Sequence, residues 1–176
     1  SCTGLSTVVP IEQFNFFGQL VMAILMEIGA LGFIIFISYI WAKKNKKMRM
    51  SDIIMVNDSI NGDNYSTIKE YSIFIFNIMI KVQLLGVILL AVKFIPEYGV
   101  LKGIWFSIFH TISAFANSGF DLCGSQGMIV YNKDIYIQLV LIVIMILGSI
   151  GIFALEDLKN NKLKNFNKLK LQTKII

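Results

Sequence analysis

The amino-acid sequence predicts an all-α membrane protein with three spanning helices and one shorter, re-entrant helix. Of its 176 residues, 56% are hydrophobic and only 15% are charged, and the mean hydropathy is +0.70. In a typical soluble domain about a quarter of the residues are charged. The apolar residues gather in long runs, and most basic residues flank these runs. One histidine and two cysteines exclude a zinc cluster or a disulfide-rich scaffold.

Three apolar runs are long enough to cross a bilayer as helices: Phe16–Trp41, Ser72–Ile95 and Ile135–Leu155. A hydrocarbon core of about 30 Å needs about 20 helical residues. A fourth stretch, Gly103–Ala116, has 14 residues, which is too short to span. We therefore expect it to be a buried or re-entrant helix that enters and leaves on one face, as a pore helix does.

The basic residues predict the orientation of the three crossings. Six lie between the first and second runs and six follow the third, so 12 of the 16 fall on one side. By the positive-inside rule, residues 42–70 and 157–176 are expected in the cytoplasm, and residues 1–14 and 96–133 on the outer face. This topology accounts for the net charge of +5, so no nucleic-acid partner is expected.

The chain contains an internal repeat. Residues 17–33, FGQLVMAILMEIGALGF, align with residues 136–152, YIQLVLIVIMILGSIGI, at a constant offset of 119. Upstream of each of these helices lies a glycine followed by a large apolar residue. The two pairs, Gly4-Leu5 and Gly119-Phe120, are 115 positions apart. Apolar matches are common in membrane helices, so the most telling identities are the polar, methionine and glycine pairs: Gln19/Gln138, Met26/Met145, Gly29/Gly148 and Gly32/Gly151.

Three short segments of the first copy and one long motif of the second carry a family resemblance. They are TGLST at 3–7, FGQL at 17–20, IGALGF at 28–33, and FHTISAFANSGFDL at 109–122. They resemble the Trk/Ktr/HKT-type potassium transporters, most closely the bacterial TrkH/KtrB-like membrane subunits. The resemblance covers essentially the whole chain and is most specific in the long second motif.

The resemblance implies four repeats of helix, re-entrant pore helix, filter and second helix in one polypeptide. On this scheme residues 1–41 hold the first filter and its following helix, and residues 42–70 form a cytoplasmic loop. The second repeat is 71–156, and 157–176 lead to a third repeat, so we expect the chain to be an excerpt. Within the second repeat we expect a helix at 71–95, a pore helix at 101–116, a filter at 117–121 and a helix at 134–156.

Potassium uptake across the bacterial plasma membrane is the function that the resemblance implies. Potassium is the transported ion, and no covalently bound cofactor is expected. The implied partners are the lipid bilayer, a second copy in a homodimer, and a cytoplasmic nucleotide-binding regulatory subunit. A permeating ion must exchange its hydration shell for backbone carbonyls, and glycine readily adopts the backbone conformations that this requires. The expected carbonyl ligands and their flanking residues are Thr3, Gly4, Asn117, Ser118 and Gly119, with Leu5, Phe120 and Asp121 beside them.

Other polar residues near the filter have more than one interpretation. His110, Thr111 and Ser113 are expected to hydrogen-bond within the pore helix and to the filter wall rather than to bind ions. Asp121 either concentrates cations at the mouth or serves as a loop carboxylate or cap. Cys2 and Cys123 are expected to be free thiols, although a disulfide between them is conceivable.

The spanning helices carry small residues and one acid. Small residues let membrane helices approach closely, so packing is the expected role of Gly29, Gly32, Gly148 and Gly151. Glu27 is a possible functional acid, because a carboxylate inside a membrane helix is costly. Three interpretations stay open: a protonated carboxyl, an ion pair with a basic residue of another repeat, and a position near the ion path.

Other functions fit the sequence less well. No phosphate-binding glycine loop, HExxH motif or nucleophile elbow is present, so no enzyme is expected. A non-conducting scaffold or truncated remnant would not need the glycine-bearing segment 117–120. A sodium-permeable cation transporter of the same fold stays open, as does a natural two-repeat protein that dimerises.

Overall fold

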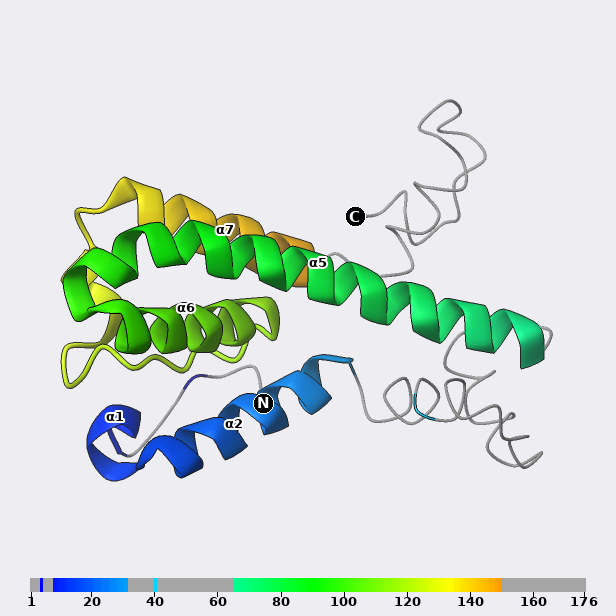
Figure 1. Ribbon diagram of the computed structural model, residues 1–176, viewed down its shortest axis with the longest axis horizontal. Helices are drawn as coiled ribbons and strands as arrows, with labels where there is room; N and C mark the ends of the chain where they lie inside the picture. The colour runs from blue at the N-terminus through cyan, green and yellow to red at the C-terminus, as the bar shows by residue number, and fades with distance from the viewer. Residues whose placement is uncertain (1–3, 5–7, 32–39, 41–64, 150–176) are drawn as a thin grey trace.

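The computed structural model describes residue 4 and residues 8–31, 40 and 65–149. Its helices are α1 (Pro10–Gln13), α2 (Phe16–Leu31), α5 (Tyr65–Tyr98), α6 (Val100–Phe115) and α7 (Ile135–Ser149), with a 3-10 turn, η1 (Gly127–Tyr131). The described part contains no β-strand, which agrees with the predicted all-α class. In Figure 1, α5 and α7 run side by side, and α6 lies between them and α2.

The chain between α5 and α7 leaves one end of the bundle and returns to it. After α6, residues 117–134 run back along this helix, and the start of α7 meets the end of α5 (Figure 1). The ammonium of Lys93 lies 2.7 Å from the carboxylate of Asp134, and the hydroxyl of Tyr131 donates to Glu97 at 2.8 Å. A 16-residue helix is about 24 Å long, which is shorter than a bilayer core.

The two helices of the internal repeat begin in the same way. The side chain of Asn15 accepts a hydrogen bond from the backbone N–H of Gly18 at 3.0 Å. At the equivalent position, Asp134 accepts from the N–H groups of Tyr136 and Ile137. These are N-caps, which satisfy donors that the first turn of a helix leaves unpaired. The repeated element therefore includes its helix start.

The glutamine that both copies contain also has a shared structural role. Gln19 donates to the carbonyl of Phe14 at 3.1 Å, just before α2. Gln138 donates to the carbonyls of Tyr131 and Asn132, at 3.1 and 2.7 Å, just before α7. Each glutamine thus ties its helix to the segment that leads into it.

The core forms where α5, α6 and α7 meet. Its fully buried apolar side chains include Ile75, Leu90, Phe94, Phe109, Leu122 and Ile137. Gly103 permits the closest approach of α5 and α6, because a Cβ at this position would lie 2.6 Å from the Cα of Ile95. The outward faces of α2, α5 and α7 carry large exposed apolar residues, among them Leu25, Leu84, Ile88 and Leu139. Such faces suit contact with lipid or with further protein.

The predicted boundaries differ from the observed ones mainly at α5. This helix begins at Tyr65 rather than 71, so residues 65–70 of the predicted loop are helical, and it continues through Pro96 to Tyr98. The apolar run marks the part that fits a bilayer, whereas residues such as Lys69 and Glu70 favour helix without being apolar. Proline so near the end of a helix removes only one terminal hydrogen bond. The short elements α1 and η1 were not predicted.

Helices α6 and α7 begin within one residue of their predicted starts. Among the described residues, Ile73–Tyr98 is long and apolar enough to cross a membrane, and Phe16–Ala30 and Ile135–Ser149 are shorter apolar helices. The rest of the first and third predicted runs lies outside the described residues, as do most of the predicted loop 42–70 and all of 157–176.

Candidate ion filter and its surroundings

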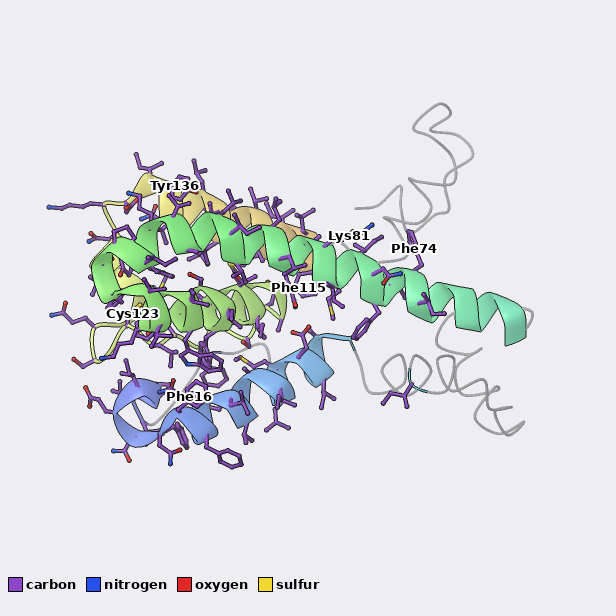
Figure 2. The ribbon with its side chains drawn as sticks, viewed as in Figure 1. Phe16, Phe74, Lys81, Phe115, Cys123 and Tyr136 are labelled. Carbon is purple, nitrogen blue, oxygen red and sulfur yellow. The ribbon has the colours of Figure 1, made fainter. Side chains whose placement is uncertain are left out.

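The predicted second filter begins in a helix-terminating turn. The N–H of Ser118 donates to the carbonyl of Ser113 at 3.0 Å, and that of Asn117 donates to Ala114 at 3.1 Å. Asn117 has a φ of +50°. This pair of bonds around a left-handed residue is the Schellman motif, in which asparagine is the usual alternative to glycine. The turn reverses the chain, so that residues 118–123 follow α6 back (Figure 2).

Two buried serines join α6 to the predicted filter segment, residues 117–121. The hydroxyl of Ser113 donates to the carbonyl of Phe120 at 2.5 Å. The hydroxyl oxygens of Ser113 and Ser118 lie 3.1 Å apart. Ser118 in turn contacts the sulfur of Met26 in α2 at 2.8 Å. Both serines are only 3% exposed. Because an unpaired buried polar group costs about 1–3 kcal/mol, these bonds hold the backbone of residues 118–120 in one conformation.

The two glycines predicted from separate repeats lie against each other. A Cβ added at Gly4 would lie 2.8 Å from the carbonyl oxygen of Gly119, and one added at Gly119 would lie 3.1 Å from the Cα of Gly4. Their φ angles are +59° and +77°, a region that side chains disfavour. Only glycine therefore fits both the backbone conformation and the approach. Thr3 and Leu5 lie outside the described residues.

Cavities lie on both sides of the filter segment. One, of about 300 Å³, is lined by α6, by residues 117–121 and by Leu141 and Met145 of α7. The other, of about 310 Å³, is lined by α2 residues including Met26, together with Ala116, Ser118 and Phe120. Met26 and Met145 are equivalent in the repeat, so the two repeated helices flank the segment with matching side chains.

His110 of α6 is held through both ring nitrogens. Its Nδ1 lies 2.7 Å from the carbonyl of Phe106, and its Nε2 accepts the N–H of Leu122 at 3.3 Å. Since a carbonyl only accepts, Nδ1 carries the proton, and His110 is neutral in this arrangement. Thr111 departs from the expectation of a hydrogen bond: its buried hydroxyl has no partner among the described residues. The methyl group of Thr111 instead packs against Gly86 of α5.

Asp121 and Cys123 form the outer turn after the filter. The carboxylate of Asp121 accepts the N–H of Cys123 at 3.0 Å, so it closes a local turn; its effect on cations stays a prediction. Cys123 is a free thiol, and Cys2 lies outside the described residues. Burial, followed by the charges of Asp121 and Glu97, raises the pKa of the Cys123 thiol to about 12.

The predicted packing glycines have different surroundings. Gly148 lies so close to the carbonyl of Phe115 that a Cβ would overlap it, so α7 contacts the very end of α6 there. Around Gly29 no described atom lies within 4 Å of the Cβ position. Gly32 and Gly151 lie outside the described residues. Next to Gly148, the hydroxyl of Ser149 accepts from the side-chain amide of Asn117 at 3.1 Å.

Glu27 has a partner that the sequence analysis did not identify. The side-chain amide of Gln83, in α5, donates to both carboxylate oxygens of Glu27 at 2.9 Å. This hydrogen bond joins the two repeats within the apolar part of the bundle. A buried carboxylate with an amide donor costs less than an unpaired one, which explains how α2 accommodates the acid.

The described residues form a bundle of apolar helices in which Gly4 and Gly119 meet backbone to backbone. Residues 1–168 match the family model of TrkH, described as cation transport protein. The chain belongs to the TrkH family, and the predicted Trk/Ktr resemblance is confirmed. The family is one of membrane transporters rather than enzymes.

Curated relatives are similar over most of this chain. The potassium/sodium uptake protein NtpJ of Enterococcus hirae is 36% identical over 156 residues, which cover 89% of this chain and 34% of the relative. Ktr system potassium uptake protein B of Bacillus subtilis is 33% identical over 99% of this chain and 38% of its own length. The protein of the same name from Vibrio alginolyticus is 25% identical over 100% and 38%. The chain thus spans little more than a third of these relatives.

We predict that Ser113→Ala loosens the filter segment. The substitution removes the donor to the Phe120 carbonyl, which loses about 1 kcal/mol of local stability, so amide exchange across residues 117–122 should become roughly fivefold faster. Hydrogen-deuterium exchange of the protein in detergent measures this.

Ser107→Ala is the matched control, because this equally buried serine of α6 bonds only to the Gly103 carbonyl of its own helix. Equal exchange rates in the two variants across residues 117–122 would contradict the role assigned to Ser113.

Proposed function

We propose that the intact gene product takes up potassium across the bacterial plasma membrane, and that the ion is held by backbone carbonyls of its filter segments. In this chain the proposed ligands belong to Thr3, Gly4, Asn117, Ser118 and Gly119, with Leu5 and Phe120 flanking them. The observation that carries the proposal is the contact of Gly4 with Gly119. Two glycines from separate repeats, both left-handed and backbone to backbone, are what a shared ring of carbonyls requires.

The electrostatic setting favours a cation. The filter segment follows the carboxyl-terminal end of α6 directly, where the helix macrodipole is equivalent to about half a negative charge. The local backbone is already held by Ser113 and His110, so its carbonyls need not reorganise to meet an ion. We propose that α6 is a re-entrant pore helix, since the chain returns to the end at which α6 begins.

Sodium permeation by the same site is the second candidate. It is supported by the name of the Enterococcus relative, a potassium/sodium uptake protein. A non-conducting scaffold remains the alternative if no flux is found. The Bacillus relatives are named as proteins B and D of a Ktr system, which supports, as a further proposal, a homodimer that acts with a cytoplasmic nucleotide-binding regulatory subunit. Residues 42–70 and 157–176 are then cytoplasmic.

We predict that Gly119→Ser in the intact protein lowers the preference for potassium over sodium by roughly fivefold or more. A Cβ at this position meets the backbone of Gly4 and forces a disfavoured φ, which costs about 1–3 kcal/mol, and each 1.4 kcal/mol is a factor of ten. Competitive uptake of the two ions in a potassium-uptake-deficient strain measures the ratio.

The control is Gly124→Ser, which imposes the same backbone strain at a φ of +85° but has no described neighbour within 4 Å. If Gly119→Ser keeps the wild-type ratio, or if Gly124→Ser lowers it as much, the filter assignment fails.

We further propose that the charge of Glu27 strengthens cation binding. In Glu27→Gln the amide keeps a hydrogen bond to Gln83 but carries no charge. At an effective dielectric constant near 20, Coulomb's law gives about 1 kcal/mol for two unit charges even when they are about 16 Å apart, and more at shorter range. We therefore expect the KM for potassium to rise roughly five- to tenfold.

Uptake kinetics measured beside Glu12→Gln, an exposed acid of α1, test this effect. A KM for Glu27→Gln equal to that of the wild-type protein would remove the idea.

A further inference from the structure

Three soft donor atoms come together beside the filter segment. The thiol sulfur of Cys123 lies 3.4 Å from the thioether sulfur of Met128 and 3.6 Å from Nε2 of His110. The three residues come from the outer turn, η1 and α6. Within the described residues no group of three or more His, Cys, Asp or Glu side chains is placed to hold a metal. The cluster is a candidate only because methionine completes it.

The spacing of the donors suits a small three-coordinate ion. With metal–sulfur and metal–nitrogen bonds of about 2.3 and 2.0 Å, a trigonal arrangement separates two sulfurs by about 4.0 Å and a sulfur from a nitrogen by about 3.7 Å. The sulfur–nitrogen distance already fits. The two sulfurs need to separate by roughly half an ångström, which the unbranched methionine side chain accommodates.

We propose that Cys123, Met128 and His110 bind a soft monovalent metal ion of the Cu(I) and Ag(I) class. Thiolate, thioether and imidazole are the ligands that such ions prefer. The sulfur–metal bond replaces the S–H bond, the proton passes to water, and the oxidation state of the metal is unchanged. The N–H of Leu122 gives up its bond to His110 in exchange. Potassium is a hard ion that prefers oxygen ligands, so this site differs from the proposed filter in its donor atoms.

The cluster is accessible from two sides. The half-buried thiol of Cys123 lines a cavity of about 450 Å³ with Trp105 and Leu122. His110 and Met128 line the neighbouring cavity beside residues 117–121. The carboxylate of Asp121, whose Oδ1 accepts the N–H of Cys123, adds negative charge close to the sulfur, which favours a cation there.

Silver titration of the purified intact gene product tests the site. Ag(I) is added in chloride-free buffer against a competing chelator of known affinity. We expect one high-affinity site, which weakens at least 100-fold in Cys123→Ser and about tenfold in Met128→Leu. The matched control, Met145→Leu, should stay within twofold of the wild-type protein, because the side chain of Met145 does not belong to the cluster.

The proposal fails if Cys123→Ser or Met128→Leu binds silver as the wild-type protein does, or if Met145→Leu weakens binding as much as Met128→Leu. Should Cys123→Ser not fold, Met128→Leu and Met145→Leu decide the outcome. A second readout is amide exchange of residues 121–128, which silver should slow in the wild-type protein and in Met145→Leu but much less in Met128→Leu. Equal slowing in both methionine variants would also overturn the site. These measurements do not depend on transport.

Discussion

The structure depends on satisfying the polar backbone of a non-helical segment that lies among apolar helices. Unpaired N–H and C=O groups are costly in such surroundings. From Asn117 to Cys123 the partners come from the protein itself: two carbonyls of α6 close the turn, Ser113 donates to Phe120, His110 accepts from Leu122, and Asp121 accepts from Cys123. At the centre of this segment, the backbone of Gly119 meets that of Gly4.

The internal repeat explains why the rest of the chain is arranged around this segment. The repeated helices α2 and α7 begin with equivalent caps, at Asn15 and Asp134, and flank the segment with equivalent methionines. Across the repeats, Glu27 bonds to Gln83. Within the second repeat, Gly148 contacts the end of α6. Both copies of the duplicated unit therefore contribute to the surroundings of this segment.

Much of the fold follows from patterns that local physics determines. The apolar run that begins at Ile135 predicts the start of α7, and the internal repeat pairs Gly4 with Gly119. The run Gly103–Ala116 predicts α6 but begins three residues after the helix does. Other features depend on tertiary geometry. The bond from Gln83 to Glu27 joins residues 56 positions apart, and no periodicity reveals it. The methyl group of Thr111 packs against Gly86, and its hydroxyl has no partner among the described residues. Helix α5 begins before the apolar run does, so the run does not reveal its first residues.

The central claim is that the backbones of Gly4 and Gly119 face one ion path. Anomalous scattering from crystals of the intact protein grown with rubidium, a potassium substitute, tests it most directly. The account predicts an anomalous peak in direct contact with backbone carbonyl oxygens of both glycine-bearing segments. Well-ordered crystals with rubidium bound elsewhere, and no peak between these two segments, would contradict it.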